Sequence, residues 1–246
     1  KRKKVQGNSP PDRPAFYNRR AAAMKLPKSG IQKIRLGICN TYLIGGKKGT
    51  ILVDAGQAGW EGLFFRQLKR LGIRPEDVQL IVVTHVHFDH VGNLKAMAQR
   101  CRCPVAIHTN EAPLLRGGTV VFPPGINLFG NVAASVGRGL APLLKFSAVT
   151  PDILVKEELS LEPFGVSGKI VATPGHTIGS LSVLLADGTA CVGDLAANYY
   201  PGRIGPILPP FANNRDMLLE SWKHLLHAGA KTICPGNGPP FPAQYL

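Results

Sequence analysis

Hydrophobic and polar residues alternate from residue 31 onward in a pattern that predicts strands before helices. Residues 31–36 alternate strictly, residues 41–44 form a second short apolar run, and residues 50–54 form a third after the glycine-rich turn 45–49. Alternation with a period of two is typical of half-buried strands, and tight glycine-containing turns join antiparallel neighbours. The pattern therefore predicts an opening set of antiparallel strands.

Helices and strands then alternate along the chain. A short β-branched run, such as the one at residues 79–83, is typical of a buried strand, whereas residues 63–72 have the spacing of an amphipathic helix that stops at a glycine. We favour a structural role for His108, at the end of one of these strands, over a position facing a site. The further expected elements are helices at 93–98 and 216–227 and strands at 105–107, 169–172, 181–185, 189–194 and 230–234.

Residues 117–155 differ from the rest of the chain. The segment is apolar, but Gly117-Gly118 and Pro123-Pro124-Gly125 interrupt it. It is too long for an ordinary connection and too apolar for a disordered linker, which favours a lid or a wall of a substrate pocket. Contact with a membrane and a helical excursion that only packs on the core are the alternatives.

Composition indicates one catalytic domain, from residue 29 to residue 246. A chain of 246 residues with 44% hydrophobic residues can bury a large core. We expect a cytoplasmic protein without a membrane span, because it contains neither eighteen consecutive apolar residues nor the apolar run of a signal peptide. The five cysteines are odd in number and lack zinc-ribbon spacing, so we expect reduced, mostly buried thiols.

The formal net charge of +14 is concentrated near the start of the chain. Residues 1–28 hold nine of the 29 Lys and Arg residues and a single acid, Asp12. Without apolar periodicity, this segment is expected to be a disordered basic arm or a leader. A basic arm can bind phosphate backbones, so a nucleic-acid-binding scaffold or a nuclease is the alternative function, although we do not expect a nucleic-acid partner.

The densest candidate chemistry lies in residues 84–90, directly after a predicted strand. His85 and His87 are two residues apart, so in extended chain both imidazoles point to one side and can bind one ion. Asp89 and His90 are expected on the turn beyond, where Gly92 allows a sharp bend, and can reach a second ion. Imidazole and carboxylate are the ligands of catalytic zinc and of dinuclear hydrolytic sites. A set of hydrogen-bonded surface histidines is the alternative.

Three strand ends in the rest of the chain carry further candidate ligands. His176 follows a Pro-Gly turn and can be the third ligand of the first ion. Asp194, at the end of its strand, has two oxygens and can bridge two ions. Asp54 can hold a ligand by a hydrogen bond or can be an ordinary turn residue. His224 and His227 lie in a predicted helix, where we expect surface or packing roles.

These motifs, in this order, resemble those of the metallo-β-lactamase-fold hydrolase superfamily, which includes glyoxalase II and lactonase-like members. The resemblance runs from about Ile31 to Phe241 and implies an α/β fold, an αββα sandwich of two mixed β-sheets flanked by helices with a dinuclear site at one sheet edge. The matching blocks are His85-Val86-His87-Phe88-Asp89-His90, Thr173-Pro174-Gly175-His176-Thr177, Ile178-Gly179-Ser180 and Gly193-Asp194.

The resemblance also implies ligand roles and two zinc sites. It assigns His85, His87 and His176 to one metal and Asp89 and His90 to the second, with a shared ligand between them. That bridging ligand is Asp194.

The sequence departs from the family pattern at Asn237, where members usually carry histidine in Pro-Gly-His-Gly. An amide oxygen is a weaker zinc ligand than imidazole. We therefore expect a second site that is weak or that Mn or Fe occupies.

The expected mechanism is attack on an acyl bond by a zinc-activated hydroxide, because metal lowers the pKa of a bound water toward ~7. Asp89 can orient the nucleophile or accept its proton. Tyr199 and Tyr200 are candidates to hydrogen-bond the oxyanion, or are packing aromatics. A small-molecule lactone or thioester is the favoured substrate, with a β-lactam or a phosphoester as further options; a metal-poor binding scaffold is the alternative class. No sequence feature sets the oligomeric state.

Overall fold

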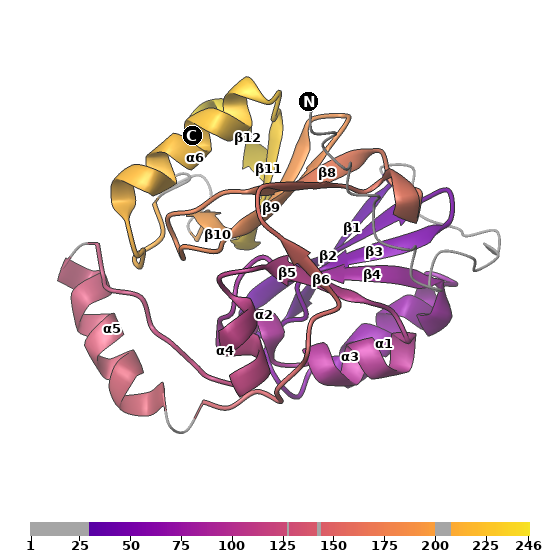
Figure 1. The fold of residues 1–246 in the computed structure, drawn as a ribbon, viewed down its shortest axis with the longest axis horizontal. Coiled ribbons are helices and arrows are strands. Elements are labelled where there is room, and N and C mark those ends of the chain that lie inside the picture. The colour runs from indigo at the N-terminus through magenta and orange to yellow at the C-terminus, as the bar shows by residue number, and fades with distance from the viewer. Residues whose placement is uncertain (1–29, 127, 142–143, 200–207) are drawn as a thin grey trace, which may run out of the picture.

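The computed structural model describes residues 30–246 except 127, 142–143 and 200–207. The expected basic arm at residues 1–28 and the candidate Tyr200 therefore lie outside the described residues. Within the described part, two six-stranded sheets pack face to face (Figure 1).

The first sheet has the order β1-β2-β3-β4-β5-β6. β1, β2 and β3 pair antiparallel, as predicted, and β3 to β6 pair parallel. The six strands are β1 (Ile31–Leu36), β2 (Cys39–Gly46), β3 (Gly49–Val53), β4 (Val78–Val82), β5 (Val105–His108) and β6 (Ile153–Val155).

The second sheet has the order β12-β11-β10-β9-β8-β7. Its pairs are antiparallel except for β10 with β11, which run parallel, so both sheets are mixed. The strands are β7 (Glu158–Ser160), β8 (Gly168–Ala172), β9 (Leu181–Leu185), β10 (Thr189–Ala197), β11 (Thr232–Asn237) and β12 (Phe241–Pro242).

Helices cover the outer face of each sheet. Figure 1 shows α1 and α3 against the first sheet and α6 against the second, while α5 stands at the edge of the molecule. The predicted αββα sandwich is therefore confirmed. The helices are α1 (Glu61–Arg70), α2 (Phe88–Val91), α3 (Leu94–Cys101), α4 (Ala112–Gly117), α5 (Leu128–Leu140) and α6 (Arg215–His227), with short 3₁₀ turns η2 (Pro75–Asp77), η4 (Glu162–Phe164) and η5 (Ala243–Tyr245).

Apolar side chains fill the space between the layers. β3 and β4 are buried almost throughout, because one face packs on the second sheet and the other on helices. Ile51 and Leu80 join Val183 between the sheets, whereas Phe64 and Leu68 of α1 pack on the outer face. This double burial explains why the strands are continuous apolar runs in the sequence.

The structure differs from the sequence prediction in the connection between the two halves. Residues 153–155, at the end of the expected insertion, form β6 and extend the first sheet, and residues 158–160 form the unpredicted edge strand β7. Both strands have three residues, which is too short for an alternation pattern to be evident.

The five cysteines are free and buried, as predicted. Within the described ranges, no helix combines the length and apolar composition that crossing a membrane requires.

Candidate metal centre

The stretch after β4 brings four candidate ligands to one edge of the sandwich. The chain stays extended through His87, which precedes α2 with φ −119° and ψ 153°, and the short helix α2 then carries Asp89 and His90. The expected turn at Asp89 and His90 is therefore wrong. Gly92 does lie in the turn that joins α2 to α3, as expected, but its φ of −57° is one that any residue adopts, and a Cβ there would collide with the backbone nitrogen of Ala58. Glycine is required for close approach.

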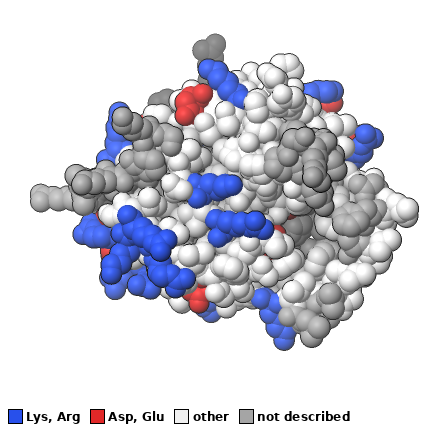
Figure 2. Space-filling view, turned by 180° about the vertical axis from the view of Figure 1, so that it is seen from behind, with Lys and Arg blue, Asp and Glu red and all other residues white. Residues whose placement is uncertain are grey.

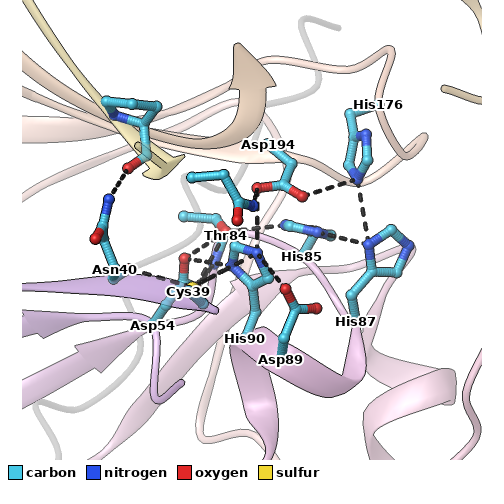
Figure 3. Close-up of polar contacts among 12 residues, drawn as sticks. Cys39, Asn40, Asp54, Thr84, His85, His87, Asp89, His90, His176 and Asp194 are labelled. Carbon is cyan, nitrogen blue, oxygen red and sulfur yellow. Dashed lines mark hydrogen bonds and ion pairs between the residues drawn. The ribbon is translucent and has the colours of Figure 1, made fainter. Parts of the chain in front are cut away.

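Three imidazole nitrogens converge at the centre of this site (Figure 3). Nδ1 of His87 lies 2.9 Å from Nε2 of His85 and 3.2 Å from Nε2 of His176. The possible ligand atoms of these histidines and of Asp194 all lie within 4.8 Å of one another. The sequence predicted this grouping although His85 and Asp194 are 109 residues apart in the chain.

Burial keeps these imidazoles neutral. It lowers the pKa of His85 and of His87 well below the usual histidine range, and the neighbouring imidazoles lower it further. The pKa of His176 is also lowered, chiefly by burial. Neutral rings present lone pairs, which is the state that binds a metal ion.

Hydrogen bonds behind the rings fix their orientation. Nδ1 of His176 donates to the backbone carbonyl of Phe211 at 2.8 Å, which leaves its Nε2 unprotonated. Nδ1 of His85 lies 3.0 Å from Oγ1 of Thr84. Such partners hold metal-binding histidines in one tautomer. The converging nitrogens fit a tetrahedral ion, for which Zn–N bonds of ~2.0–2.1 Å imply nitrogens about 3.3 Å apart.

His90 lies in a second group beside the first. Its Nδ1 donates to Oδ2 of Asp54 at 2.8 Å, while its Nε2 lies 3.2 Å from Oδ1 of Asp194 and 3.9 Å from Oδ2 of Asp89. Of the two roles considered for Asp54, the hydrogen-bonding role is the one observed. The Cys39 thiol lies 3.5 Å from Nδ1 of His90, and burial raises the pKa of this thiol to about 12.

Asp194 lies between the two groups. Its Oδ1 faces His90, and its Oδ2 lies 3.9 Å from Nε2 of His176. The preceding Gly193 has φ +54°, and a Cβ there would meet the side chain of Thr84, so only glycine fits both the backbone and the space. One carboxylate thus presents one oxygen to each group, which is the arrangement of a bridging ligand.

Asn237 reaches the site from the end of β11, which continues past the predicted end at residue 234. Its Nδ2 donates to Oδ1 of Asp194 at 2.9 Å. The amide therefore occupies a hydrogen-bonding position on the carboxylate that faces both groups. Asn40 fixes this corner, because its Nδ2 donates to the carbonyls of Pro235, at 3.0 Å, and of Gly238, at 2.6 Å.

The other predicted residues are not among the converging ligand atoms. Tyr199 lines the pocket and is partly exposed, with 41% of its surface accessible. His108 has the structural role that we favoured: its Nε2 donates to the carbonyl of Lys156, and its Nδ1 accepts from the backbone of Asn110. His224 and His227 are exposed on α6, as expected.

A pocket of about 560 Å³ opens over Asp89, Asp194 and Asn237. Val121 and Phe122, from the segment predicted to be a lid or wall, form part of its side. The remaining contributors belong to no motif of the sequence, and only the alternation along β1 could have indicated that two of them, Lys33 and Arg35, share a face. The contributors not predicted are Lys33, Arg35, Ile38, Asn40, Pro209, Pro210, Phe211 and Pro239.

Comparison with known proteins identifies the family. The metallo-beta-lactamase superfamily model matches residues 34–237. A probable metallo-hydrolase of Methanocaldococcus jannaschii, MJ0888, is 34% identical over 164 residues, which cover 67% of this chain and 70% of that protein. Mouse metallo-beta-lactamase domain-containing protein 1 is 45% identical over 196 residues, covering 79% of this chain and 61% of that protein.

Solved structures agree with this assignment at the level of the fold. The crystal structure of the BLEG-1 B3 metallo-beta-lactamase superposes with a TM-score of 0.65 at 23% identity, covering 87% of this chain and 94% of that chain. The chain belongs to the metallo-beta-lactamase superfamily. This membership places it among the metallo-hydrolases, the enzyme class that the sequence predicted.

Proposed function

We propose that the protein hydrolyses an acyl bond in a small-molecule substrate, with a lactone or a thioester favoured. The observation that carries this proposal is the convergence of three neutral imidazoles beside a carboxylate whose second oxygen faces another ligand group. His87 and Asp194 of this set line an open pocket that a small molecule can enter.

The donor set fits zinc at the first position, held by His85, His87, His176 and Asp194. At the second position, Asp89, His90 and Asp194 would hold an ion, with Asn237 beside them. When bound, such ions lower the pKa of a water molecule and polarise the acyl carbonyl of a substrate.

The chain itself supplies proton handling and orientation. Asp89 lies on the pocket floor, and burial raises the pKa of its carboxyl to about 6, against the lowering effect of the His90 imidazole. A carboxylate on the pocket floor can orient a water molecule and accept its proton. We assign Asp89 to orienting the attacking water and taking its proton, and Tyr199 to hydrogen-bonding the oxygen of the acyl group.

The pocket wall favours substrates with an apolar portion. Val121, Phe122 and Phe211 surround the entrance to the ligand groups and provide an apolar surface for an acyl chain. A lactone or a thioester combines such a chain with a reactive carbonyl.

A substrate panel tests the proposal. The purified protein is assayed on lactones, thioesters, β-lactams and phosphoesters after chelation and after addition of zinc. We expect zinc-dependent turnover of a lactone or thioester, and His87→Ala should abolish it and lower the bound zinc without changing the melting temperature by more than a few degrees. His224→Ala, on the exposed face of α6, is the matched control. Turnover that survives chelation, or zinc content unchanged in His87→Ala, would disprove the proposal.

A further inference from the structure

Two basic side chains lie at the mouth of the pocket, on the edge strand β1. Lys33 and Arg35 both line the pocket and are exposed, whereas the alternate residues Ile34 and Leu36 are buried in the core. Side chains two residues apart on a strand point to the same side. The strand thus presents two positive charges to the pocket and two apolar side chains to the core.

The strand register shows which way these cations face. Lys33 pairs with Tyr42, and Arg35 pairs with Asn40, across the antiparallel strands. Directly opposed residues of an antiparallel pair lie on the same face. Tyr42 and Asn40 both donate to the carbonyl of Pro235, two residues before Asn237, so this face is turned toward the end of β11. The two cations are consequently on the same side of the sheet as the candidate metal centre.

The charges of Lys33 and Arg35 are not compensated by the protein groups that the structure describes. Within the described ranges, no carboxylate forms an ion pair with either side chain; Nε of Arg35 donates to the carbonyl of Gly37 at 3.1 Å. Of the acidic residues that line the pocket, Asp194 faces the three imidazoles, and Asp89 lies 3.9 Å from Nε2 of His90. Basic side chains also dominate the charged surface of the face drawn in Figure 2, where acidic side chains are few. An approaching anion therefore meets positive charge.

Apolar groups complete the recognition surface. Ile38 and Val121 line the same pocket and have 50% and 43% of their surfaces exposed. Exposed apolar side chains beside uncompensated cations fit a ligand that has both an apolar body and an anionic group. A ligand with only one of these features would contact only the apolar side chains or only the cations.

We propose that Lys33 and Arg35 form an anion subsite that selects substrates carrying a carboxylate or a phosphate at the end remote from the scissile acyl bond. The inference rests on the proposed hydrolase function and specifies its substrate class, an acidic and partly apolar thioester or lactone. Arg35 can bind either anion through two parallel hydrogen bonds, and Lys33 adds a point charge.

A set of matched thioesters tests the subsite. Three substrates share one acyl chain and end in a carboxylate, a phosphate or an uncharged amide, and each is assayed with wild-type protein, Lys33→Gln, Arg35→Gln and the double variant. Lys47→Gln, on the turn after β2 and outside the pocket lining, is the control of equal charge. We expect the double variant to lose at least about tenfold in kcat/KM on the anionic substrates.

The pattern of losses distinguishes a subsite from a general effect. The loss should appear mainly in KM, should shrink as salt rises, and should leave the amide substrate and the Lys47→Gln variant within roughly twofold of wild type. The preference between the carboxylate and phosphate substrates identifies the anion. Equal losses on all three substrates, or wild-type protein that does not prefer the anionic ones, would overturn the proposal.

A binding measurement separates this inference from the proposed function. If wild-type protein hydrolyses neither thioesters nor lactones, the hydrolase proposal fails, and the subsite is then measured by calorimetry with hexanesulfonate, an anion that binds metal ions weakly, against hexanol. The subsite is supported if hexanesulfonate binds more weakly to the double variant than to wild type while hexanol binding is unchanged. Equal hexanesulfonate binding in all variants overturns it. Cleavage of a single-stranded oligonucleotide that depends on Lys33 and Arg35, without selection among thioesters, would overturn it in favour of a nuclease.

Discussion

Asp54 holds His90 from the side opposite the nitrogen that faces Asp194: Nδ1 of the imidazole lies 2.8 Å from Oδ2 of Asp54, and both side chains are buried. The carboxylate also accepts from the backbone nitrogen of Thr84 at 2.8 Å and from its hydroxyl at 3.0 and 2.8 Å. Asp54 adopts φ 61°, an unusual conformation for a residue other than glycine. The backbone of Asp54 is thus strained, and its buried carboxylate links Thr84 to the ring of His90.

Asp54→Asn should weaken metal binding at the second position. The backbone nitrogen of Thr84 donates to Oδ1 and Nδ1 of His90 to Oδ2, so an amide, whose nitrogen replaces one of these oxygens, leaves one of the two donors facing another donor. We expect affinity for the second ion to fall about 10- to 100-fold and the free energy of unfolding to fall by about 1–3 kcal/mol. Competition titration with a zinc-binding dye measures the affinity, and Asp152→Asn, an exposed carboxylate that accepts from Val105, is the control. Unchanged affinity in Asp54→Asn would show that His90 needs no such support.

Phe122→Ala should change substrate preference rather than metal content. The ring of Phe122 lies 6.1 Å from that of Phe88, and Gly137 of α5 packs so closely on it that a Cβ would come within 2.7 Å of the ring. Removing the ring widens the apolar wall, and we expect a loss of about 10- to 100-fold in kcat/KM on long acyl chains relative to short ones. Leu128→Ala, 82% exposed on α5, is the control. Equal losses for all chain lengths would indicate a structural role.

Stability should depend on pH through Asp77, which ends η2 before β4. Hydrogen bonds from Arg74, at 2.7 and 3.2 Å, lower the pKa of the Asp77 carboxyl. A lowered folded pKa means that the stabilisation is present above the unfolded pKa of ~3.9 and is lost as pH falls through the folded value. Asp77→Asn should therefore lower the free energy of unfolding by about 1 kcal/mol near neutral pH, after allowance for solvent screening.

Urea denaturation at about pH 7 and about pH 3 measures this dependence. The difference between wild type and Asp77→Asn should narrow at the lower pH, because the unfolded wild-type chain then binds a proton at Asp77 that the folded carboxyl resists, and this shifts the equilibrium toward unfolding. Glu76→Gln, which removes an exposed neighbouring carboxylate, is the control. A difference that is the same at both pH values would mean that the Asp77 charge does not contribute.

The sequence was sufficient to predict the elements that carry strong periodicity and the residues at their ends. His85, His87 and His176 were grouped because strand ends in one layered fold meet at one edge, and the three nitrogens do converge. The short helix α2 was not predicted because four residues contain no helical period, and its formation is decided by packing. For the same reason, the three-residue strands β6 and β7 were not predicted.

Contacts between residues far apart in the chain were beyond sequence reasoning. Cys39 lies against His90 across 51 residues, and Phe211 fixes the ring of His176 across 35 residues, yet neither belongs to a ligand motif. A backbone carbonyl such as that of Phe211 carries no side-chain signal at all. Such partners become evident only when the packing of β2 and of the 209–211 segment against the site is known.

We expect Asn237 to weaken ion binding at the second position. Its Nδ2 donates at 2.9 Å to Oδ1 of Asp194, the same oxygen that lies 3.2 Å from Nε2 of His90. The amide nitrogen cannot coordinate metal, and its hydrogen bond occupies an oxygen that would otherwise be free to bind. Replacing the amide by an imidazole removes the competing donor and adds a lone pair.

Asn237→His should therefore raise affinity for the second ion more than tenfold, which corresponds to about 1.4 kcal/mol or more, and should raise turnover at low added zinc. Zinc titration of the chelated proteins measures both positions. The first should be unchanged, because Asn237 donates to Oδ1 of Asp194, whereas Oδ2 is the oxygen that faces His176. Asn237→Ala separates the two contributions: it removes the hydrogen bond to Asp194 without adding a ligand. If Asn237→Ala binds the second ion as tightly as Asn237→His, the hydrogen bond is the obstacle and the missing imidazole is not. If wild type and both variants share one titration curve with two tight sites, Asn237 does not weaken the second position.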